Sequence, residues 1–272
     1  MSTYQVNGIS LHAKFAGSGP PLLLLHGFTG SAATWCALAE RLAPLRRTIA
    51  VDLIGHGESD ALADSARYTA EHCVADLLAL LDSLGVDRFE LLGYSLGGRI
   101  ALQLAAAAPE RVARLVLESS TAGIADPAER LARAAADDAL ADAIERDGLA
   151  AFVDRWERLP LWASQAALPV EARERLRAQR LRNRPLGLAN SLRGMGAGRP
   201  APLWDRLPEL GMPALLLAGA LDEKYCALAR QMAAAMPRAQ LAIIPGAGHA
   251  IHLERFDVFT DRVITFLEQS HD

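Results

Sequence analysis

The sequence predicts an α/β fold in which a mostly parallel sheet is flanked by helices. Short apolar runs alternate with stretches of helical periodicity, and the connections between successive runs are long enough for βαβ crossovers. Continuous apolar runs of this length are typical of strands buried on both faces, as in a parallel sheet. Hydrophobic residues make up 51% of the 272 positions, which is enough for one large core.

The first two strands are expected to form a hairpin. Residues 4–15 alternate around Asn7-Gly8, a dipeptide that favours a two-residue hairpin turn. The remaining strands are expected at 22–25, 48–53, 88–94, 114–120, 213–219 and 239–246. Helical periodicity predicts helices at 31–43, 70–84, 96–108, 224–236 and 257–268.

The strand–helix alternation stops between residues 122 and 205. This stretch is rich in arginine and alanine and has helical spacing without a convincing strand. Glycine and prolines divide it into about four helices, at Gly148, Pro160, Pro169 and Pro185. We therefore expect residues 1–121 and 206–272 to form the core, and 122–205 to be an inserted helical lid.

Composition excludes several classes of protein. The net charge of −4 and the pI near 6.0 leave no basic field that would attract nucleic acid. Three widely spaced cysteines form neither a CxxC pair nor a disulfide framework, which suits a reducing cytosol. The first twenty residues lack a signal-peptide pattern, and the longest apolar runs are too short to span a bilayer. We expect a cytoplasmic protein, a monomer or small homo-oligomer, with no membrane partner.

The most informative motif is a serine at a strand-to-helix turn. GYSLG at 93–97 follows one expected strand and opens the next expected helix. A nucleophilic serine in this position has strained backbone and an exposed hydroxyl, and the turn needs glycine on both sides. The helix that follows points its first N–H groups at the place where negative charge develops. The pattern indicates that Ser95 is the nucleophile of an α/β-hydrolase fold; the alternative is an ordinary loop serine.

A candidate acid and a candidate base follow the serine in the chain order of this fold, Ser, acid, His. Asp222 ends GALD at 219–222 after an expected strand, and His249 ends GAGH at 246–249 after the last one. The alternative for Asp222 is a helix N-cap, with Glu223 as the nearest substitute acid. The glycine-rich loop favours His249 over its rivals, which are His252 and the more distant His12, His72 and His271.

A second glycine-containing loop is a candidate oxyanion hole. HGFTG at 26–30 directly follows a buried strand, and in this fold such a loop donates one N–H, here from Phe28, beside the N–H of Leu96. His26 is expected to bond the loop backbone. The segment 52–59, DLIGHGES, contains one Asp and one His, which is not a metal-ligand set, so we expect a turn bordering the site.

The amino-acid sequences of several segments are more specific than the fold. They resemble the MenH family of menaquinone biosynthesis, the 2-succinyl-6-hydroxy-2,4-cyclohexadiene-1-carboxylate synthases. The similar segments span nearly the whole chain: LHGFTGSAATW at 25–35, GYSLGGRIAL at 93–102, ESSTAGIADPAERLAR at 118–133, FVDRWERLPLW at 152–162, LRAQRLRN at 176–183, SLRGMGAG at 191–198, LDEKY at 221–225 and GAGHAIHLE at 246–254.

The resemblance implies a lyase rather than a hydrolase. The family removes a proton from its substrate and expels pyruvate, with no metal and no cofactor. By motif, the triad falls on Ser95, Asp222 and His249. The residues that would contact a polycarboxylate substrate are Tyr94, Arg99, Arg133, Trp156 and Arg180.

The position of Arg99 independently supports an anionic substrate. Arg99 lies one helical turn after Ser95, so the two side chains share a face, and a partly desolvated guanidinium there needs an anion. A structural ion pair is the alternative for Arg99, and a stronger one for Arg133 and Arg180, whose close competitors are Arg130 and Arg177. Trp162 competes with Trp156, and either is also a candidate for simple packing.

Two other functions remain open on sequence grounds. The nearest is a serine hydrolase of the same fold, a carboxylesterase or a hydrolase of carbon–carbon bonds, because the same triad and oxyanion hole serve both chemistries. A ligand receptor without catalysis is a different class. The complete Ser–Asp–His set argues against a receptor, since binding alone needs no activated serine.

Overall fold

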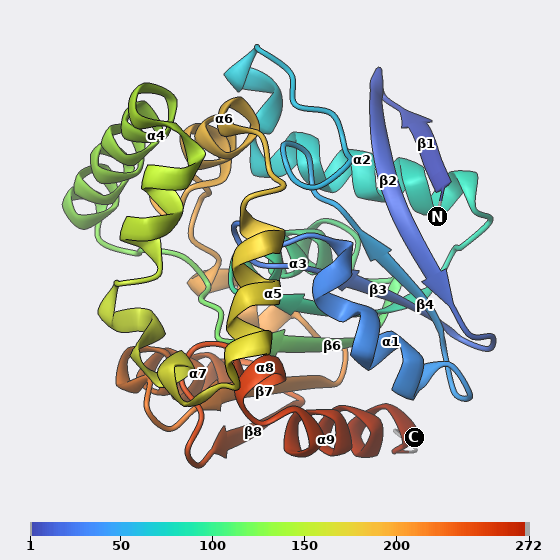
Figure 1. Cartoon of the computed structure of the whole chain (residues 1–272). Helices are drawn as coiled ribbons and strands as arrows, with labels where there is room; N and C mark the ends of the chain where they lie inside the picture. Colours follow the sequence, from blue (N-terminus) through green and yellow to red (C-terminus); the bar gives the residue numbers. More distant parts are fainter. Residues whose placement is uncertain (1, 270–272) are drawn as a thin grey trace.

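In the computed structural model, which describes residues 2–269, the strands form one eight-stranded sheet in the order β1-β2-β4-β3-β5-β6-β7-β8 (Figure 1). The first two pairings, β1 with β2 and β2 with β4, are antiparallel, and all the others are parallel. The strands are β1 (Ser2–Val6), β2 (Ile9–Ala16), β3 (Pro21–Leu25), β4 (Arg47–Val51), β5 (Phe89–Tyr94), β6 (Val112–Glu118), β7 (Ala214–Gly219) and β8 (Ala239–Ile244). The mostly parallel sheet predicted from the sequence is confirmed.

The expected hairpin joins β1 and β2. Asn7 (φ 46°) and Gly8 (φ 81°) both have positive φ, as a type I′ turn requires, and Val6 pairs with Ile9 across it. A strand pair of this kind twists in the same sense as the rest of the sheet, so β2 can continue into the antiparallel pairing with β4.

Helices cover both faces of the sheet. On one face α1 (Cys36–Leu42) and α9 (Phe256–Glu268) pack over Leu22, Leu24 and Leu92, with Trp35 and Phe259 among the fully buried residues. On the other face α2 (Ala70–Ser83), α3 (Leu96–Ala107) and α7 (Glu223–Ala235) enclose a second apolar cluster. Shorter helices are η1 (Ala32–Trp35), η2 (Ser65–Tyr68), η4 (Trp204–Glu209) and α8 (Ile251–Glu254).

The segment expected to be an insertion, residues 122–205, is helical between β6 and β7. It contains α4 (Pro127–Trp156), η3 (Pro160–Ala167), α5 (Val170–Arg180) and α6 (Pro185–Met195). The predicted breaks fall where these helices end or bend, because Gly148 (φ 82°) interrupts α4 and Pro185 begins α6. Below we call residues 122–205 the helical insertion.

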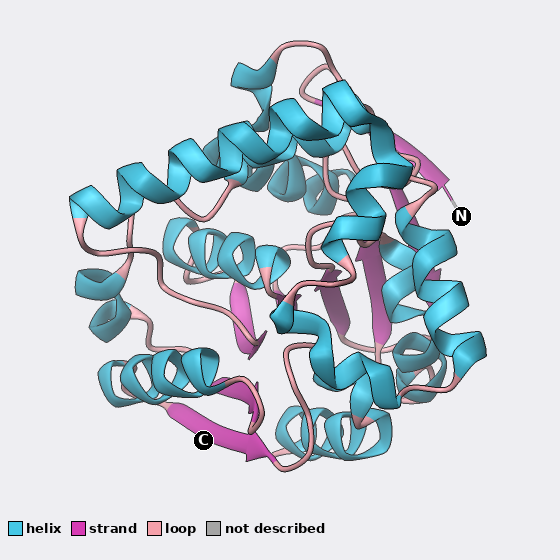
Figure 2. Cartoon of the chain, turned by 60° about the vertical axis from the view of Figure 1, so that its left-hand side comes forward, coloured by secondary structure: helices cyan, strands magenta, loops and turns pink. Residues whose placement is uncertain are grey.

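The helical insertion has its own apolar cluster. Ile144 and Phe152 of α4 pack against Leu188 and Leu192 of α6, and the two helices lie side by side in Figure 1. Figure 2, with this side of the molecule turned forward, shows helices lying in front of the strands. None of the helices within residues 2–269 is long and apolar enough to cross a membrane.

The amino ends of three strands are held together by one buried carboxylate. Glu90 on β5 accepts from Arg46 Nε at 2.5 Å and from Arg114 Nη1 at 3.0 Å, and only 3% of its side chain is exposed. The same two arginines donate to backbone carbonyls at the end of the chain, at Leu267 and Gln269. A buried charge of this kind is stable only while its partners are present.

Glu90→Gln is therefore expected to lower the free energy of unfolding by about 3 kcal/mol, because two arginines lose their counter-charge in a buried setting. Urea denaturation followed by circular dichroism measures the change. The matched control is Asp138→Asn, which removes the partner of Arg199 at an exposed pair and should cost less than about 1 kcal/mol. Equal losses in the two variants would contradict the buried-pair argument.

Candidate active site

Ser95 occupies the tight turn between β5 and α3. Its backbone has φ 51° and ψ −108°, a conformation that residues with side chains rarely adopt. The turn is possible because its neighbours are glycines: a Cβ on Gly93 would strike the backbone of Gly97, and one on Gly97 would strike the carbonyl oxygens that end β3. The backbone at Ser95 is therefore strained, and the glycines on either side have no room for a side chain, as the sequence predicted.

The structure brings the three predicted triad residues together. Ser95 Oγ lies 3.0 Å from His249 Nε2, and His249 Nδ1 lies 2.7 Å from Asp222 Oδ2. The His249 side chain is 1% exposed and that of Asp222 9%, so both hydrogen bonds are shielded from water. In this arrangement the Nδ1 proton is donated to the carboxylate, which leaves the Nε2 lone pair facing the serine hydroxyl.

Asp222 also caps α7, so the N-cap that the sequence offered as an alternative is present together with the contact to His249. Its Oδ1 accepts from the N–H of Tyr225 at 3.3 Å, while Oδ2 faces His249. The loops that carry the acid and the imidazole are joined directly, because Leu221 N–H donates to Ala247 O at 2.9 Å. The separation between carboxylate and imidazole is therefore set by backbone contacts as well as by the side chains.

The rival histidine, His252, belongs to a different pair. Its Nδ1 lies 2.9 Å from Glu118, and its backbone N–H donates to the same carboxylate at 3.0 Å. Sequence analysis did not single out Glu118, although an acidic residue ending a buried strand is a signal of an internal partner. The Tyr94 ring packs edge-on against His252, with centroids 4.6 Å apart. His12 pairs with Asp52 and His72 is on the surface, while His271 lies outside the described residues.

The loop after β3 lies against the serine. A Cβ on Gly27 would come within 2.6 Å of the Tyr94 ring and 3.5 Å of Ser95 Cβ, so only glycine fits there. His26 bonds the loop backbone as predicted, with Nδ1 2.8 Å from Gly27 O and Nε2 accepting from Leu53 N–H. These contacts place Gly27, the residue before Phe28, against Ser95.

The loop at 52–59 is a braced turn. The carboxylate of Asp52 accepts from the N–H groups of Ala32 at 2.5 Å and Glu58 at 2.8 Å, and it lies 2.9 Å from His12 Nδ1. Across residues 2–269, no group of three His, Cys, Asp or Glu side chains is placed to hold a metal ion.

Arg99 projects from α3 toward the helical insertion. Its Nη2 donates to the carbonyl of Met195 at 3.1 Å, and its buried Nε has no hydrogen-bond partner among the described residues. Burial lowers the pKa of the Arg99 guanidinium. Arg133 acts in the same direction, while Tyr225 and Asp137 oppose the shift. Within the described chain no carboxylate forms an ion pair with Arg99, in contrast to the structural ion pair that sequence analysis left open.

Arg133 and Arg180 each have a carboxylate partner. Arg133 Nε donates to the buried Asp137 at 2.9 Å, while its side chain remains half exposed. Arg180 is buried, donates to Glu157 at 2.8 Å, and has an unpartnered Nε. Burial lowers the pKa of Arg180 and the Glu157 carboxylate opposes that shift. The competitor Arg177 is more exposed and also bonds Glu157.

The two tryptophans of the helical insertion have different neighbours. Trp156 packs edge-on against Phe28, with centroids 5.5 Å apart. Trp162 packs edge-on against His249 at 5.5 Å, and the Arg180 guanidinium lies 5.6 Å from the centre of its ring. The indole N–H of each is buried and has no acceptor among residues 2–269. Trp162 therefore contacts the triad histidine directly, whereas Trp156 contacts Phe28 and Trp162. The sequence could not separate the two because each is an aromatic residue in a helical stretch.

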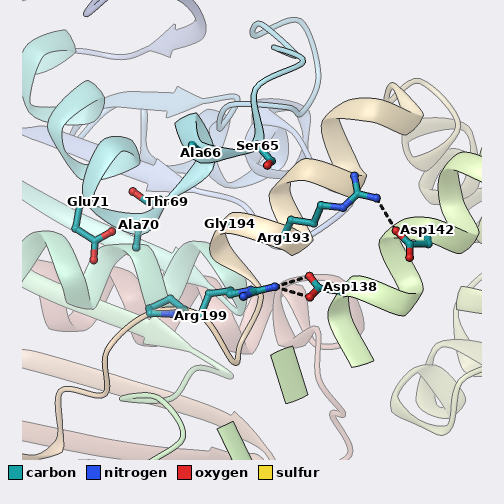
Figure 3. Close-up of a pocket in the computed structure, with 11 residues that line it drawn as sticks. Ser65, Ala66, Thr69, Ala70, Glu71, Asp138, Asp142, Arg193, Gly194 and Arg199 are labelled. Carbon is teal, nitrogen blue, oxygen red and sulfur yellow. Dashed lines mark hydrogen bonds and ion pairs between the residues drawn. The ribbon is translucent and has the colours of Figure 1, made fainter. Parts of the chain in front are cut away.

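A cavity of about 680 Å³ lies elsewhere, between the η2–α2 segment and the helices α4 and α6 (Figure 3). None of the candidate active-site residues lines it. Its two arginines already donate to carboxylates of α4, Arg193 to Asp142 and Arg199 to Asp138, as the dashed lines in Figure 3 show. Ser65 and Thr69 carry the hydroxyl groups of this cavity, and neither lies on a strained strand-to-helix turn like that of Ser95. With both arginines already paired, we favour Ser95 as the reactive site.

The sheet order and the serine turn with its His and Asp neighbours define the α/β-hydrolase class, and residues 20–256 match the family model described as alpha/beta hydrolase fold. The chain is 46% identical over 246 residues to a Bacillus subtilis (strain 168) protein named "Putative 2-succinyl-6-hydroxy-2,4-cyclohexadiene-1-carboxylate synthase", covering 90% of this chain and 89% of that one. A synthase of the same name from Serratia proteamaculans (strain 568) is 34% identical, with coverages of 91% and 93%.

Among solved structures, "Structure of MenH from S. aureus" superposes with a TM-score of 0.91 at 36% identity, covering 94% of this chain and 98% of that one. The chain therefore belongs to the 2-succinyl-6-hydroxy-2,4-cyclohexadiene-1-carboxylate synthases, the MenH family, within the α/β-hydrolase fold.

His56 is a buried neutral histidine at the edge of this site. Its Nδ1 lies 3.2 Å from Ile54 O, its ring packs against His26 and Phe28, and Nε2 has no partner among the described residues. Burial lowers the pKa of His56 to about 3, and His26 acts in the same direction. The folded protein thus keeps this ring neutral at pH values where an unfolded chain protonates it.

Acid should destabilise the protein partly through His56. The unfolded chain takes up a proton near the ordinary pKa of about 6.5, so stability is lost as the pH falls from there toward 3. Between about pH 7.5 and pH 4.5 this amounts to roughly 2–3 kcal/mol, a loss that His56→Gln removes. Urea titrations at several pH values measure it, with exposed His72→Gln as control. If the unfolding free energy of His56→Gln fell with pH as steeply as that of the wild type, His56 would not be a source of the acid destabilisation.

Proposed function

We propose that the protein eliminates pyruvate from 2-succinyl-5-enolpyruvyl-6-hydroxy-3-cyclohexene-1-carboxylate, giving 2-succinyl-6-hydroxy-2,4-cyclohexadiene-1-carboxylate in menaquinone biosynthesis. The relatives named above carry this product in their names. The observation that carries the proposal for this chain is Arg99, a desolvated guanidinium one turn from Ser95 that has a carbonyl, and no carboxylate, as its partner. Asp137 acts on Arg99 only from a distance, so a desolvated guanidinium without an ion-pair partner still gains from a further anion, and the proposed substrate is a polycarboxylate.

The substrate would lie between the core and the helical insertion, which we propose acts as a lid. Arg99 would bind one carboxylate, and Arg180 with its free Nε would bind another. Tyr94 and Trp156 would line the substrate site. The Trp156 N–H, which is buried and has no acceptor among the described residues, would be available to donate to the substrate. Arg133 lies near enough to Arg99 to lower its pKa, so it adds to the positive field at the proposed substrate site.

The first chemical step is proton removal from carbon. His249 takes the proton of the Ser95 hydroxyl through Nε2, and the serine oxygen takes the proton from the substrate carbon. Asp222 holds the Nδ1 proton and stabilises the imidazolium that forms. The electron pair left on carbon delocalises into the adjacent carbonyl group as an enolate.

The second part of the reaction expels the leaving group. The N–H groups of Phe28 and Leu96 would stabilise the enolate oxygen while the carbon–oxygen bond to the enolpyruvyl group breaks. The departing pyruvate enolate takes a proton, which His249 supplies, and the triad returns to its starting state. Every proton is accounted for by the substrate, Ser95 and His249, so the proposed steps use no cofactor.

We also propose a cytoplasmic enzyme, monomeric or a small homo-oligomer, that binds no nucleic acid. Cys36, Cys73 and Cys226 are free thiols, which is typical of a reducing compartment. A net charge of −4 gives the chain no excess of positive charge for phosphate backbones.

The purified protein, with no metal or nucleotide added, should release pyruvate from the enolpyruvyl substrate. A lactate dehydrogenase assay measures the pyruvate, and intact mass spectrometry during turnover should detect no adduct on Ser95. Ser95→Ala should lower kcat by orders of magnitude, since the carbon acid loses its base.

A serine hydrolase would give the opposite pattern. An acyl-enzyme would accumulate on Ser95, or p-nitrophenyl acetate would be hydrolysed at ordinary esterase rates without pyruvate release. Either result would exclude the lyase and leave the fold and the Ser95–His249–Asp222 geometry unchanged.

Arg99→Ala should cost about 2–5 kcal/mol of transition-state binding, because a substrate carboxylate loses its partner in a desolvated site. Lysine should rescue only part of the loss, since it lacks the bidentate fork. The measurement is kcat/KM for pyruvate release, with melting temperature as a control. An unchanged kcat/KM with a lowered melting temperature would assign Arg99 a structural role.

A further inference from the structure

The loop that carries His249 has little intrinsic rigidity. His249 follows Gly246-Ala247-Gly248, and Gly246 has φ +68°. Glycine has the largest conformational freedom of any residue, so a loop of this composition holds one geometry only if other groups restrain it. The hydrogen bonds of His249 need such restraint, because both depend on where its backbone places the ring.

Glu254, at the end of α8, restrains the backbone on both sides of His249. Its Oε2 accepts from the N–H of Gly248 at 2.5 Å, and its Oε1 lies 3.4 Å from the N–H of Ala250. One carboxylate therefore spans the two peptide groups that flank the histidine. Hydrogen bonds from backbone N–H groups to an ionised carboxylate are shorter and stronger than those to a neutral acceptor.

No cation competes for this carboxylate. Glu254 is half-buried, and within the described chain it forms no ion pair with an arginine, lysine or histidine. Its two oxygens are used on the loop alone. Within residues 2–269 its side chain forms no hydrogen bond with Ser95 or with the ring of His249, so we expect its effect on the reaction to pass through the backbone.

We propose that Glu254 is a positioning residue, which holds His249 in register with Ser95 and Asp222 by binding the N–H groups of Gly248 and Ala250. The inference rests on the proposed function only in that His249 is taken as the base. The ring is held by its own neighbours, Tyr225 at 4.5 Å and Trp162 at 5.5 Å between centroids. Glu254 supplies what these aromatic contacts cannot, the position of the main chain.

Glu254→Gln is the first test, because it keeps the shape but replaces one acceptor oxygen by a donor NH2 that faces a backbone N–H. We expect kcat for pyruvate release to fall about 10- to 100-fold, the scale of a small misplacement of a catalytic group. KM should stay within about twofold of wild type, because the substrate contacts are elsewhere.

Glu254→Asp separates geometry from charge. It keeps the negative charge but is one methylene too short to span both N–H groups, so it should be impaired like Glu254→Gln. The matched control is Asp126→Asn, which removes a carboxylate from the backbone N–H of Glu129 at the remote start of α4. The control should leave kcat unchanged.

A second measurement does not depend on the substrate. The proton shared by His249 Nδ1 and Asp222 should give a far-downfield ¹H NMR resonance that Asp222→Asn abolishes. In Glu254→Gln the resonance should broaden or disappear, while Asp126→Asn should retain it.

The proposal is wrong if Glu254→Gln keeps both a wild-type kcat and a wild-type resonance, or if Glu254→Asp is fully active. It is also wrong if kcat per folded molecule is unchanged and only the melting temperature falls. Failure of the wild-type protein to release pyruvate would instead overturn the proposed function, and the NMR comparison would still decide the role of Glu254.

Discussion

The backbone of Ser95 is held in a conformation that costs on the order of 1–3 kcal/mol for a residue with a side chain, and the surrounding structure is built to maintain it. Gly97 packs against the carbonyl oxygens at the end of β3, and Gly98 against the side chain of Ser120 after β6. Because the turn touches two neighbouring strands, it can be tight only where a parallel sheet brings their carboxyl ends together. The strand order therefore determines where a serine hydroxyl can be presented.

The loops around this serine share a second physical feature, which is that each is held by one polar side chain. His26 bonds the backbone of the loop after β3, Asp52 braces the loop after β4, and Glu254 binds the loop after β8. Loops rich in glycine lose much entropy when they are ordered, and buried hydrogen bonds to backbone groups offset that loss. Several polar contacts outside the triad thus hold the loops that surround Ser95.

The sheet and the serine turn could be predicted from the sequence, whereas several helix boundaries and side-chain pairings could not, for physical reasons. Apolar runs and Asn7-Gly8 predicted the sheet, since burial and turn chemistry are local properties. The expected single helix at 31–43 is instead η1 followed by α1, because the side chain of Ser31 caps a separate short turn. The Glu118–His252 pair and the hydrogen bonds of Glu254 to the His249 loop were not predicted, since such pairings leave no periodic signal in the sequence. Trp162, which packs against His249, could not be told from Trp156 for the same reason.

The hydrogen bond from Arg99 to Met195 O joins the helix that follows the serine to the end of α6. One end of this contact belongs to the core and the other to the helical insertion, so neither part carries a complete set of partners by itself. A helical insertion with a different backbone path at this point would leave the Arg99 Nη2 group without its acceptor. Any rearrangement of the helical insertion near Met195 is therefore felt by the guanidinium that projects from the core beside Ser95.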